Sequence, residues 1–522
     1  MNMVDVLSNS VRRYPEKMAL ICGDVRLTYK LFNDRCNRLA NSFNTLGLKR
    51  GDHFALLTKN SHHFFEMFFA GAKIGAAFVP LNYRLSPREH IYIINDSEAK
   101  ILFFAKEYLP LIQTIRRELK GVNTYICTDD KVDGMSSYEE VLSHADPSEP
   151  DSSFINEDDL VSIFYTSGTT GYPKGVMISH KNRMTDIIHQ AADFEYIEPE
   201  DVYLNIGPLF HVAVFGNSLA HLYVGCTVVI IKEFDPKRIF ELIEKERIRA
   251  FWAAPTMIQT LLDSPERKKY NLTSIKTIAY ASSPMPMETM KKAMEFFGPN
   301  LFVQFFGATE TGPQITHLRK QDHVLQGTER QLKKLRSVGI ESQMVHARIV
   351  DEEGKDVPIG QIGEIIVKSD GVTKGYWKKP EETLQASKDG WFYMGDLGYM
   401  DEDRYIYIAD RKKDMIITGG ENVYSAEVEN VLYMHPAIAE AAVIGVPHEK
   451  WVEAIKAVIA LKPGAKATEQ EIIEFCKQNL ASYKKPAYVE FVTEMPKTSM
   501  GKILKRELRE LYGKPKDKKM SG

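Results

Sequence analysis

The stretch TVVIIKEFDPKRIFELIEKERIRAFWAAP, residues 227–255, indicates the fold of the larger part of this chain. Its first apolar run is followed by Asp235, which can cap a helix, and by Pro236, which suits the first helical position. Apolar residues then recur with helical spacing until a second apolar run begins at Phe251. A strand, a helix and a second strand in this order predict parallel sheets that are covered by helices.

The same alternation occurs near the N-terminus. Residues 29–46 place a set of apolar side chains on one helical face, namely Phe32, Cys36, Leu39, Ala40 and Phe43. Apolar runs of strand length lie at residues 53–58, 76–81 and 100–105, and residues 64–75 predict a helix between the first two runs. These patterns extend the α/β expectation over the N-terminal part of the chain.

The pattern changes from about residue 337. Residues 347–369 and 401–414 contain short β-type runs broken by Gly and Asp, which predicts a small antiparallel or barrel-like sheet. After Arg411 the chain alternates helical and strand patterns over about 110 residues, the size of a small α+β domain. We therefore expect an N-terminal domain at 1–410, with a β-rich subdomain at about 337–410, and a mobile C-terminal domain at 411–522.

Composition limits the function classes. The chain has 522 residues and a formal net charge of −3, which argues against a general nucleic-acid-binding protein. Its five Cys have no CxxC spacing, which predicts reduced thiols and a cytoplasmic location rather than a zinc or disulfide framework. The sequence contains no uninterrupted run of 18 apolar residues, so it predicts no transmembrane helix. The basic end, residues 512–522, leaves peripheral contact with an anionic membrane surface open.

The stretch YTSGTTGYPKG, residues 165–175, is suited to binding phosphate groups. Glycines let backbone N–H groups converge on an anion, and the hydroxyl groups and Lys174 add donors and positive charge. The spacing does not fit GxxxxGK[ST], and the chain contains no GxGxxG, GxSxG or HExxH motif. Taken alone, the stretch is equally compatible with a Gly- and Thr-rich surface loop. Its candidate phosphate-binding residues are Thr166, Ser167, Gly168, Thr169, Thr170, Gly171 and Lys174.

A second loop, QFFGATETG at residues 304–312, follows an apolar strand pattern. Thr309 can donate a hydrogen bond to a phosphate oxygen, and Phe306 offers a flat face to a base. Glu310 supplies a hard carboxylate oxygen of the kind that Mg²⁺ binds together with substrate phosphates. Two phosphate-type loops, one of which carries a carboxylate, predict a binding site for MgATP.

These two loops are among the motifs by which the chain resembles the AMP-forming acyl-CoA synthetases. These enzymes belong to the adenylate-forming superfamily, which includes firefly luciferase and the adenylation domains of peptide synthetases. The N-terminal run at 57–85 is also similar. The motifs that carry the resemblance, in the family's order, are YTSGTTGYPKG (165–175), PLFH (208–211), YASSPMP (280–286), FFGATETG (305–312), RSVGI (336–340), GWFYMGDLG (390–398), DRKKDMIITGGENVYSAEVE (410–429) and PKTSMGKILKREL (496–508).

The resemblance implies that a carboxylic acid and MgATP form an acyl-adenylate and pyrophosphate, after which the acyl group passes to CoA. ATP and CoA are thus implied as co-substrates and Mg²⁺ as the cofactor, with Glu310 and Thr166 as its ligands. Lys502 matches the adenylation lysine, whose ammonium would bridge the acid and the α-phosphate. The remaining nucleotide-binding residues that the resemblance implies are Ser283, Pro284, Phe305, Phe306, Gly307, Ala308, Thr309, Asp396, Ile408 and Arg411.

The resemblance also implies a rotation of the C-terminal domain about Lys413. One orientation would present Lys502 to the nucleotide, and the other would present Gly419 and Gly420 to the pantetheine arm of CoA. His211 would lie beside the acyl carboxylate, although a core histidine would fit the same pattern. The chain departs from the family pattern with Phe306 in place of Tyr, Met394 in place of Thr, and Ser425 in place of Pro.

The acyl pocket implied by the resemblance consists mostly of small or apolar residues with no evident buried cation. This favours a monocarboxylic, largely apolar acid, and we expect a medium- or long-chain fatty acid. An aryl acid of the coumarate or benzoate type, a stand-alone adenylation enzyme that loads a carrier protein, a luciferase-like oxygenase and a non-catalytic sensor remain as alternatives. A homodimer is compatible with the sequence. The pocket residues are His211, Val214, Phe215, Ser282, Ala308, Gly312, Pro313, Gln314, Val338 and Gly339.

Overall fold

The computed structural model describes residues 2–166, 172–195, 197–418, 421–448, 450–498 and 502–513. The chain divides into two compact units. The first unit comprises Met1–Ala347 and Val367–Phe392, and the second comprises Arg348–Ile366 and Tyr393–Gly522. The division at residue 410 that the sequence favours stays a prediction. None of the helices in the described ranges combines the length and the apolar composition needed to cross a membrane.

The first unit contains a largely parallel sheet that we name the β8 sheet. β4 and β8 are parallel, and β9 returns antiparallel to β8. The phosphate-type loop therefore connects the last two strands of this sheet. In spatial order its described strands are β7 (Ser136–Ser137), β6 (Thr124–Cys127), β5 (Ala99–Phe104), β3 (His53–Leu57), β4 (Ala77–Pro80), β8 (Leu160–Thr166) and β9 (Lys174–Ser179).

The same unit contains a second sheet, the β14 sheet, in which the strands from β14 through β1 run parallel. Its antiparallel strands lie at the two edges. In spatial order its described strands are β16 (Ile340–Glu341), β15 (Thr316–Leu318), β14 (Phe302–Phe306), β13 (Thr277–Tyr280), β12 (Ala250–Ala253), β10 (Val202–Asn205), β11 (Thr227–Ile230), β1 (Met18–Cys22) and β2 (Val25–Thr28).

The stretch at 227–255 forms the predicted strand, helix and strand, namely β11, α9 (Pro236–Lys245) and β12. The side chain of Asp235 accepts a hydrogen bond of 3.2 Å from the Arg238 N–H, so it caps α9 as expected. Ile239, Phe240 and Ile243 are fully buried against the sheet. The apolar period of 3.6 residues therefore determines which face of α9 enters the core.

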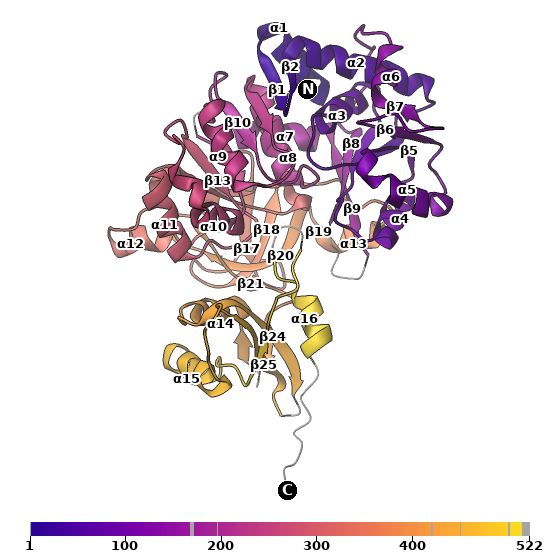
Figure 1. Ribbon diagram of the computed structural model, residues 1–522. Coiled ribbons are helices and arrows are strands. Elements are labelled where there is room, and N and C mark those ends of the chain that lie inside the picture. Colours follow the sequence, from indigo (N-terminus) through magenta and orange to yellow (C-terminus); the bar gives the residue numbers. More distant parts are fainter. Residues whose placement is uncertain are drawn as a thin grey trace. The chain divides into compact units, whose positions relative to one another are not determined.

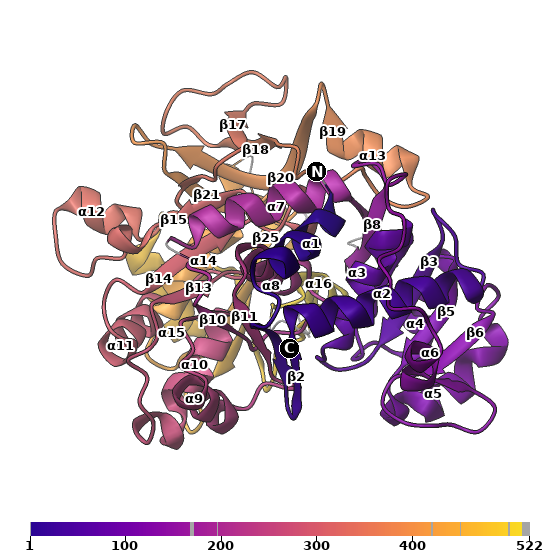
Figure 2. The same cartoon turned by 90° about the horizontal axis from the view of Figure 1, so that it is seen from above.

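Helices cover both sheets, and α3, α7 and α8 lie in the middle of the first unit between them (Figures 1 and 2). All residues of α3 are buried, as expected for a helix that is covered on every side. Besides α9, the helices of this unit are α1 (Met3–Arg13), α2 (Tyr29–Thr45), α3 (His63–Ile74), α4 (Pro87–Asp96), α5 (Leu109–Ile115), α6 (Tyr138–Ser143), α7 (His180–Asp193), α8 (Val212–Val224), α10 (Pro255–Asp263), α11 (Met287–Phe297), α12 (Glu329–Lys334) and α13 (Pro380–Ala386).

A third, smaller sheet includes β17 (His346–Val350), β18 (Gly363–Lys368), β19 (Ser387–Lys388), β20 (Trp391–Met400) and β21 (Ile406–Arg411). β20 pairs antiparallel with both β19 and β21. The short strands and Gly-containing turns of this region follow the predicted β-rich pattern. The small antiparallel sheet and the helix-covered parallel sheets confirm the expected α/β fold class.

The C-terminal part of the second unit is an α+β structure, as predicted. Alternate residues of β24 face α14 and α15, as Ala441 and Val443 do, or face α16, as Ala442 and Ile444 do. The final helix begins at Lys505, so Lys502 precedes it and is not a helical residue. The elements are β22 (Ile416–Thr418), β23 (Glu421–Val423), α14 (Ser425–Tyr433), β24 (Ile438–His448), β25 (Val452–Leu461), α15 (Glu469–Asn479), β26 (Tyr488–Val492) and α16 (Lys505–Tyr512).

Candidate functional site

The loops with candidate site residues follow neighbouring parallel strands of the β14 sheet. His211 lies after β10, Ser283 and Pro284 follow β13, and Gly307 to Glu310 follow β14. β10, β12, β13 and β14 are consecutive parallel strands, so these loops leave the same edge of the sheet. The carboxyl edge of an open parallel sheet is where such folds bind ligands.

Glu310 lies in a single 3₁₀ turn, η4 (Thr309–Thr311), directly after β14. The Tyr376 hydroxyl donates a hydrogen bond of 3.0 Å to its Oε1, and the Thr373 N–H donates one of 2.7 Å to its backbone carbonyl. Burial raises the pKa of Tyr376 above its ordinary value, and the Glu310 carboxylate raises it further. Tyr376 is therefore a neutral phenol that orients the carboxylate.

Tyr376 also contacts the first residue of β9, Lys174. The Lys174 ammonium lies 5.0 Å from the centre of the Tyr376 ring, within the range of a cation–π contact. Lys174 is the register partner of Thr166 across the two strands. One aromatic side chain thus touches the candidate phosphate lysine and the candidate metal carboxylate. Tyr376 was not predicted from the sequence. The local sequence at that position shows no more than an aromatic residue after Gly375.

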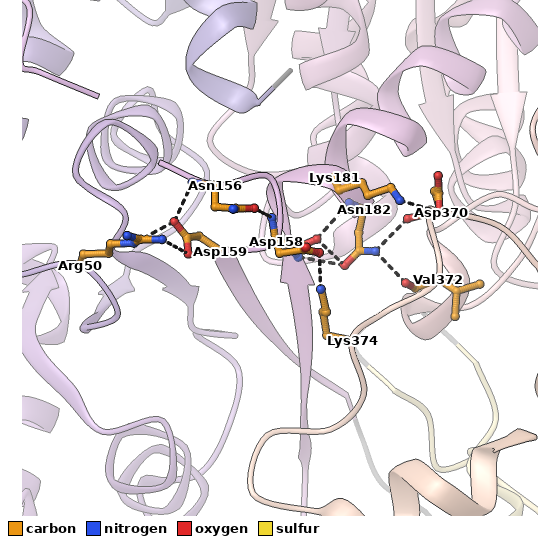
Figure 3. Close-up of polar contacts among 10 residues, drawn as sticks. Arg50, Asn156, Asp158, Asp159, Lys181, Asn182, Asp370, Val372 and Lys374 are labelled. Carbon is orange, nitrogen blue, oxygen red and sulfur yellow. Dashed lines mark hydrogen bonds and ion pairs between the residues drawn. The ribbon is translucent and has the colours of Figure 1, made fainter. Parts of the chain in front are cut away.

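The segment that carries Tyr376 is fastened to the start of α7 (Figure 3). The Asn182 side-chain amide donates hydrogen bonds to the carbonyls of Asp370, at 2.8 Å, and Val372, at 2.7 Å. The Lys374 ammonium forms an ion pair with Asp158, just before β8. The same segment forms backbone hydrogen bonds from Lys374 to Met177 of β9 and from Thr373 to Glu310.

His211 occupies the residue before α8, with its ring 4.8 Å from that of Phe210. Burial lowers the pKa of His211 to about 4, and the Arg84 guanidinium contributes in the same direction. The imidazole is therefore neutral at physiological pH. A neutral ring can lie beside a carboxylate and donate one hydrogen bond without holding it as an ion pair.

The acyl-pocket candidates on α8 are buried. Phe215 stacks on Phe65 with ring centres 5.2 Å apart and meets Phe68 edge-on at 5.1 Å. Val214, with an exposed fraction of 1%, packs against Gly207. This end of α8 therefore presents an apolar and aromatic face.

The remaining acyl candidates lie in loops, and their packing differs from residue to residue. Gly339 has a φ of +88°, and a Cβ atom there would stand 2.0 Å from the His317 carbonyl oxygen. Gly312 also has a positive φ, and the neighbouring Gln314 donates a hydrogen bond of 2.5 Å from Nε2 to Asp193. Ser282 is exposed with a φ of +77°. Pro313 is buried, Val338 is 8% exposed, and Ala308 is partly buried.

The two phenylalanines proposed beside adenine differ in accessibility. Successive side chains of a strand point to opposite faces. Phe305 is buried and meets Phe194 edge-on at 5.1 Å, whereas Phe306 keeps part of its surface exposed. Of these two rings, Phe306 is the one that can stack on a base.

In the second unit, Asp396 and Arg411 are register partners on β20 and β21. Arg411 Nε lies 2.7 Å from Asp396 Oδ1. Among the described residues, the other oxygen, Oδ2, is buried without a hydrogen-bond partner. Burial raises the pKa of Asp396, while Arg411 opposes this effect. The pair thus offers one unused acceptor, suited to a ligand hydroxyl, and Ile408 lies on the same strand as Arg411.

Lys502 lies in the same unit, and its backbone forms two hydrogen bonds with Thr498. Its carbonyl accepts a hydrogen bond of 2.7 Å from the Thr498 N–H, and its own N–H donates one of 3.2 Å to Thr498 Oγ1. The pKa of Lys502 is lowered to about 8, first by loss of hydration and then by Arg411, while Asp396 opposes this shift. Lys502 is nevertheless an exposed residue.

Lys413 follows β21 and belongs to the same charged group. Burial lowers its pKa, Asp414 opposes this effect, and Arg411 reinforces it. The structure therefore brings Asp396, Arg411, Lys413 and Lys502 into one electrostatic cluster within the second unit. The candidates Ser167, Gly168, Thr169, Thr170 and Gly171 of the phosphate loop, and Gly419 and Gly420 of the CoA loop, lie outside the described residues.

The expected metal ligands are both in the first unit. Glu310 offers a carboxylate that is only partly buried, and Thr166 offers a hydroxyl at the end of β8. Mg²⁺ prefers hard oxygen ligands and usually takes one or two carboxylates together with substrate phosphates. The donor set fits this ion.

Comparisons with known proteins identify related sequences and structures. Residues 7–377 match the family described as AMP-binding enzyme, and residues 427–502 match the AMP-binding enzyme C-terminal domain. A feruloyl-CoA synthase of an Amycolatopsis species is 35% identical, over 96% of this chain and 97% of that protein. A long-chain-fatty-acid–CoA ligase of Mycobacterium tuberculosis is 36% identical, over 94% of each chain. The ATP-bound crystal structure of MatB from Rhodopseudomonas palustris has a TM-score of 0.88 at 30% identity, covering 98% of this chain and 99% of that chain.

Proposed function

The chain belongs to the AMP-forming acyl-CoA synthetases of the adenylate-forming superfamily, and we propose that the acid it activates is a medium- or long-chain fatty acid. It is an acid–CoA ligase that uses ATP. The observation that supports a fatty acid is the apolar environment of α8. Val214 and Phe215 are buried there, and the rings of Phe65 and Phe68 surround Phe215.

In the first half-reaction an acid carboxylate must approach the α-phosphate of a polyanion. Electrostatic repulsion opposes this approach, so the protein's contribution is positioning and neutralisation of charge. We assign Lys502 to the α-phosphate and the attacking carboxylate. Lys174, held against Tyr376, is assigned to the departing phosphates.

The nucleoside is assigned to groups on both units. Phe306 would stack on adenine, and Asp396 would accept hydrogen bonds from the ribose hydroxyls through its unused oxygen. Glu310 and Thr166 would hold Mg²⁺, which neutralises phosphate charge when bound. Tyr376 orients the Glu310 carboxylate for this role.

In the second half-reaction the CoA thiol replaces AMP on the acyl carbon. We propose that the C-terminal domain turns about Lys413 between the two half-reactions and that Gly419 and Gly420 then line the path of the pantetheine arm. Neutral His211 would remain beside the acyl group.

An aryl acid is the second candidate substrate, and the relative named feruloyl-CoA synthase favours it. The two candidates are separated by a screen of pyrophosphate release across saturated fatty acids of increasing length, cinnamic-type acids and benzoic-type acids, each with CoA. We expect the highest kcat/KM among the medium or long fatty acids. A preference for the aryl acids would replace the fatty-acid proposal and leave the ligase class intact.

A further inference from the structure

Helix α7 carries polar side chains on a face that is buried. Arg183, Asp186, Gln190 and Asp193 recur at intervals of three and four residues, so they form one stripe along the helix, which we name the α7 stripe. Their exposed fractions are 0%, 0%, 0% and 3%. A helix normally turns such residues to solvent, and long charged side chains are rarely buried without partners.

Much of the α7 stripe has no hydrogen-bond partner within the described ranges. This holds for the three guanidinium nitrogens of Arg183, both carboxylate oxygens of Asp186, and the amide oxygen and nitrogen of Gln190. Arg183 and Asp186 approach each other only to 3.6 Å. Burial raises the pKa of Asp186 to about 7, against the influence of Arg183. An ion pair without further hydrogen bonds does not recover the free energy of its desolvation.

The stripe lies directly against two segments that carry acyl-pocket candidates. A Cβ atom on Gly216, next to Phe215 on α8, would stand 3.0 Å from Arg183 Nη1 and 3.3 Å from each polar atom of the Gln190 amide. A Cβ atom on Gly312 would stand 2.0 Å from Asp186 Oδ1. The two glycines therefore let the stripe reach the backbone of both pocket segments.

Further contacts fix the stripe in place. A Cβ atom on Gly371 would stand 2.6 Å from Asp186 Oδ1, and Asn182 fastens the carbonyls on either side of Gly371 (Figure 3). At the other end, Asp193 accepts the hydrogen bond of Gln314, whose own Oε1 has no partner among the described residues. Hydrogen-bonding groups without a partner among the described residues therefore lie next to pocket candidates at several positions along α7.

We propose that Arg183, Asp186 and Gln190 form a polar subsite at the end of the acyl pocket and select acids that carry a hydroxyl group remote from the carboxylate. This inference rests on the proposed function, because it specifies the acyl group of the same ligase. A hydroxyl group matches the stripe, since it can accept from the guanidinium and donate to the carboxylate or the amide oxygen. Arg183 and an ionised Asp186 carry no net charge together, so a neutral polar group suits this state of the pair better than a second carboxylate.

The test compares matched acids that differ only in the hydroxyl group. One pair is a saturated fatty acid and its ω-hydroxylated form, and the other is cinnamic acid and its para-hydroxylated form. We expect the full-length enzyme with CoA to give a kcat/KM at least about tenfold higher for the hydroxylated member of one pair, because sites built to hydrogen-bond a hydroxyl discriminate strongly against its absence. The pair that shows the preference identifies an aliphatic or a phenolic substrate.

The variant Arg183→Met/Asp186→Leu replaces both charges with apolar groups of similar shape, an exchange that buried ion pairs tolerate better than the loss of one partner. We expect the ratio of kcat/KM between the paired acids to fall to about one. Gln190→Leu should lower the same ratio without touching the ion pair, and it gives the answer if the double variant does not fold. The control Arg238→Met/Glu241→Leu removes an exposed pair with the same i, i+3 spacing on α9 and should leave the ratio unchanged.

Three results would overturn the proposal. They are an equal kcat/KM within both pairs, a higher kcat/KM for both unsubstituted acids, or a hydroxyl preference that survives in both stripe variants. In each of these cases turnover of the unsubstituted fatty acid would still support the fatty-acid proposal. Absence of turnover with every fatty acid would instead contradict the proposed function, whatever the paired ratio of the aryl acids.

Discussion

Two lysines have separate tasks in this account, and their local environments differ. Lys174 lies on β9 against the Tyr376 ring, in the first unit. Lys502 lies in the second unit with Arg411, Lys413 and Asp396 as its charged neighbours. Lys174 is suited to hold the phosphates that leave, and Lys502 to act where charge develops in the transition state. We therefore expect the larger kinetic effect from the loss of Lys502.

Lys502→Ala should lower the rate of acyl-adenylate formation by about 10²–10³, by analogy with the loss of an oxyanion donor. Thioester formation from supplied acyl-AMP and CoA should continue, because that step does not need the charge at the α-phosphate. The two half-reactions are measured separately by pyrophosphate release and by thioester formation. Equal losses in both would remove Lys502 from its assigned role.

The pH dependence of adenylation follows from the same residue. The pKa of Lys502 is lowered to about 8, and its ammonium is the protonated form. The charged form is therefore complete well below this pH and is lost as the pH rises through about 8. We expect the adenylation rate to fall over that range, and Lys502→Arg to shift the fall to higher pH because guanidinium stays charged. A profile that is flat in both proteins between neutral pH and pH 10 would contradict this.

At the level of elements, the segment from residue 370 to Tyr376 forms hydrogen bonds with β9, α7 and η4. Tyr376→Phe keeps the ring beside Lys174 and removes only the hydrogen bond to Glu310. We expect kcat/KM for MgATP in adenylation to fall by about ten- to a hundredfold, since hydrogen bonds to charged groups contribute about 1.5–3 kcal/mol. Tyr270→Phe serves as the control, because its hydroxyl lies 3.4 Å from a partly buried glutamate, Glu241, on α9. Similar kinetics for both variants would show that Tyr376 does not orient Glu310.

β25 begins with a strained residue. Val452 has a φ of +69° and an exposed fraction of 71%, so a β-branched side chain occupies the left-handed region without compensating burial. Val452→Gly should stabilise this sheet by about 1 kcal/mol, because relief of strain exceeds the entropy that glycine adds to the unfolded chain. Native-state hydrogen exchange of the β24 and β25 amides measures this. Val452→Ala should give a smaller gain, and a loss of protection in Val452→Gly would refute the strain argument.

Local signals predicted most elements. Asp235 and Pro236 begin α9 as expected, and Ser86 with Glu89 forms the capping box of α4. Such signals are readable in the sequence because their contacts span only three or four residues. Tyr376 was not predicted, since its function depends on Glu310 and Lys174, which are distant in sequence. The polar pattern of α7 is typical of a solvent-facing helix, and only the packing of α8 and Gly312 against it shows that Arg183 and Asp186 are buried.

At the scale of the whole molecule, the candidate residues are divided between the two units, so the proposed chemistry requires them to cooperate. The residues proposed for the acyl pocket, the phosphates and the metal belong to the first unit. Lys502 and Asp396, proposed for the α-phosphate and the ribose, belong to the second. The family resemblance supplied this division of roles. Apolar and turn patterns could not predict this division. Asp396 is placed by strand pairing with Arg411, and Lys502 precedes Ile503, which pairs with Lys497.

Lys413→Pro should slow thioester formation more than adenylation. Proline fixes φ near −65°, so it limits the backbone rotation that we propose at this position, while none of the proposed nucleotide-binding residues is lost. Lys413→Ala is the control, because it removes the charge and keeps the backbone free. Equal CoA-dependent rates in Lys413→Pro and the unaltered enzyme would place the hinge elsewhere or exclude it.

The central claim is that this chain activates an acid by transferring AMP to it. Exchange of labelled pyrophosphate into ATP, measured with a fatty acid and without CoA, tests this claim most directly. We predict exchange that requires the acid and Mg²⁺, followed by release of AMP and acyl-CoA once CoA is added. No exchange with any carboxylic acid, or the formation of ADP and phosphate in place of AMP and pyrophosphate, would contradict the account.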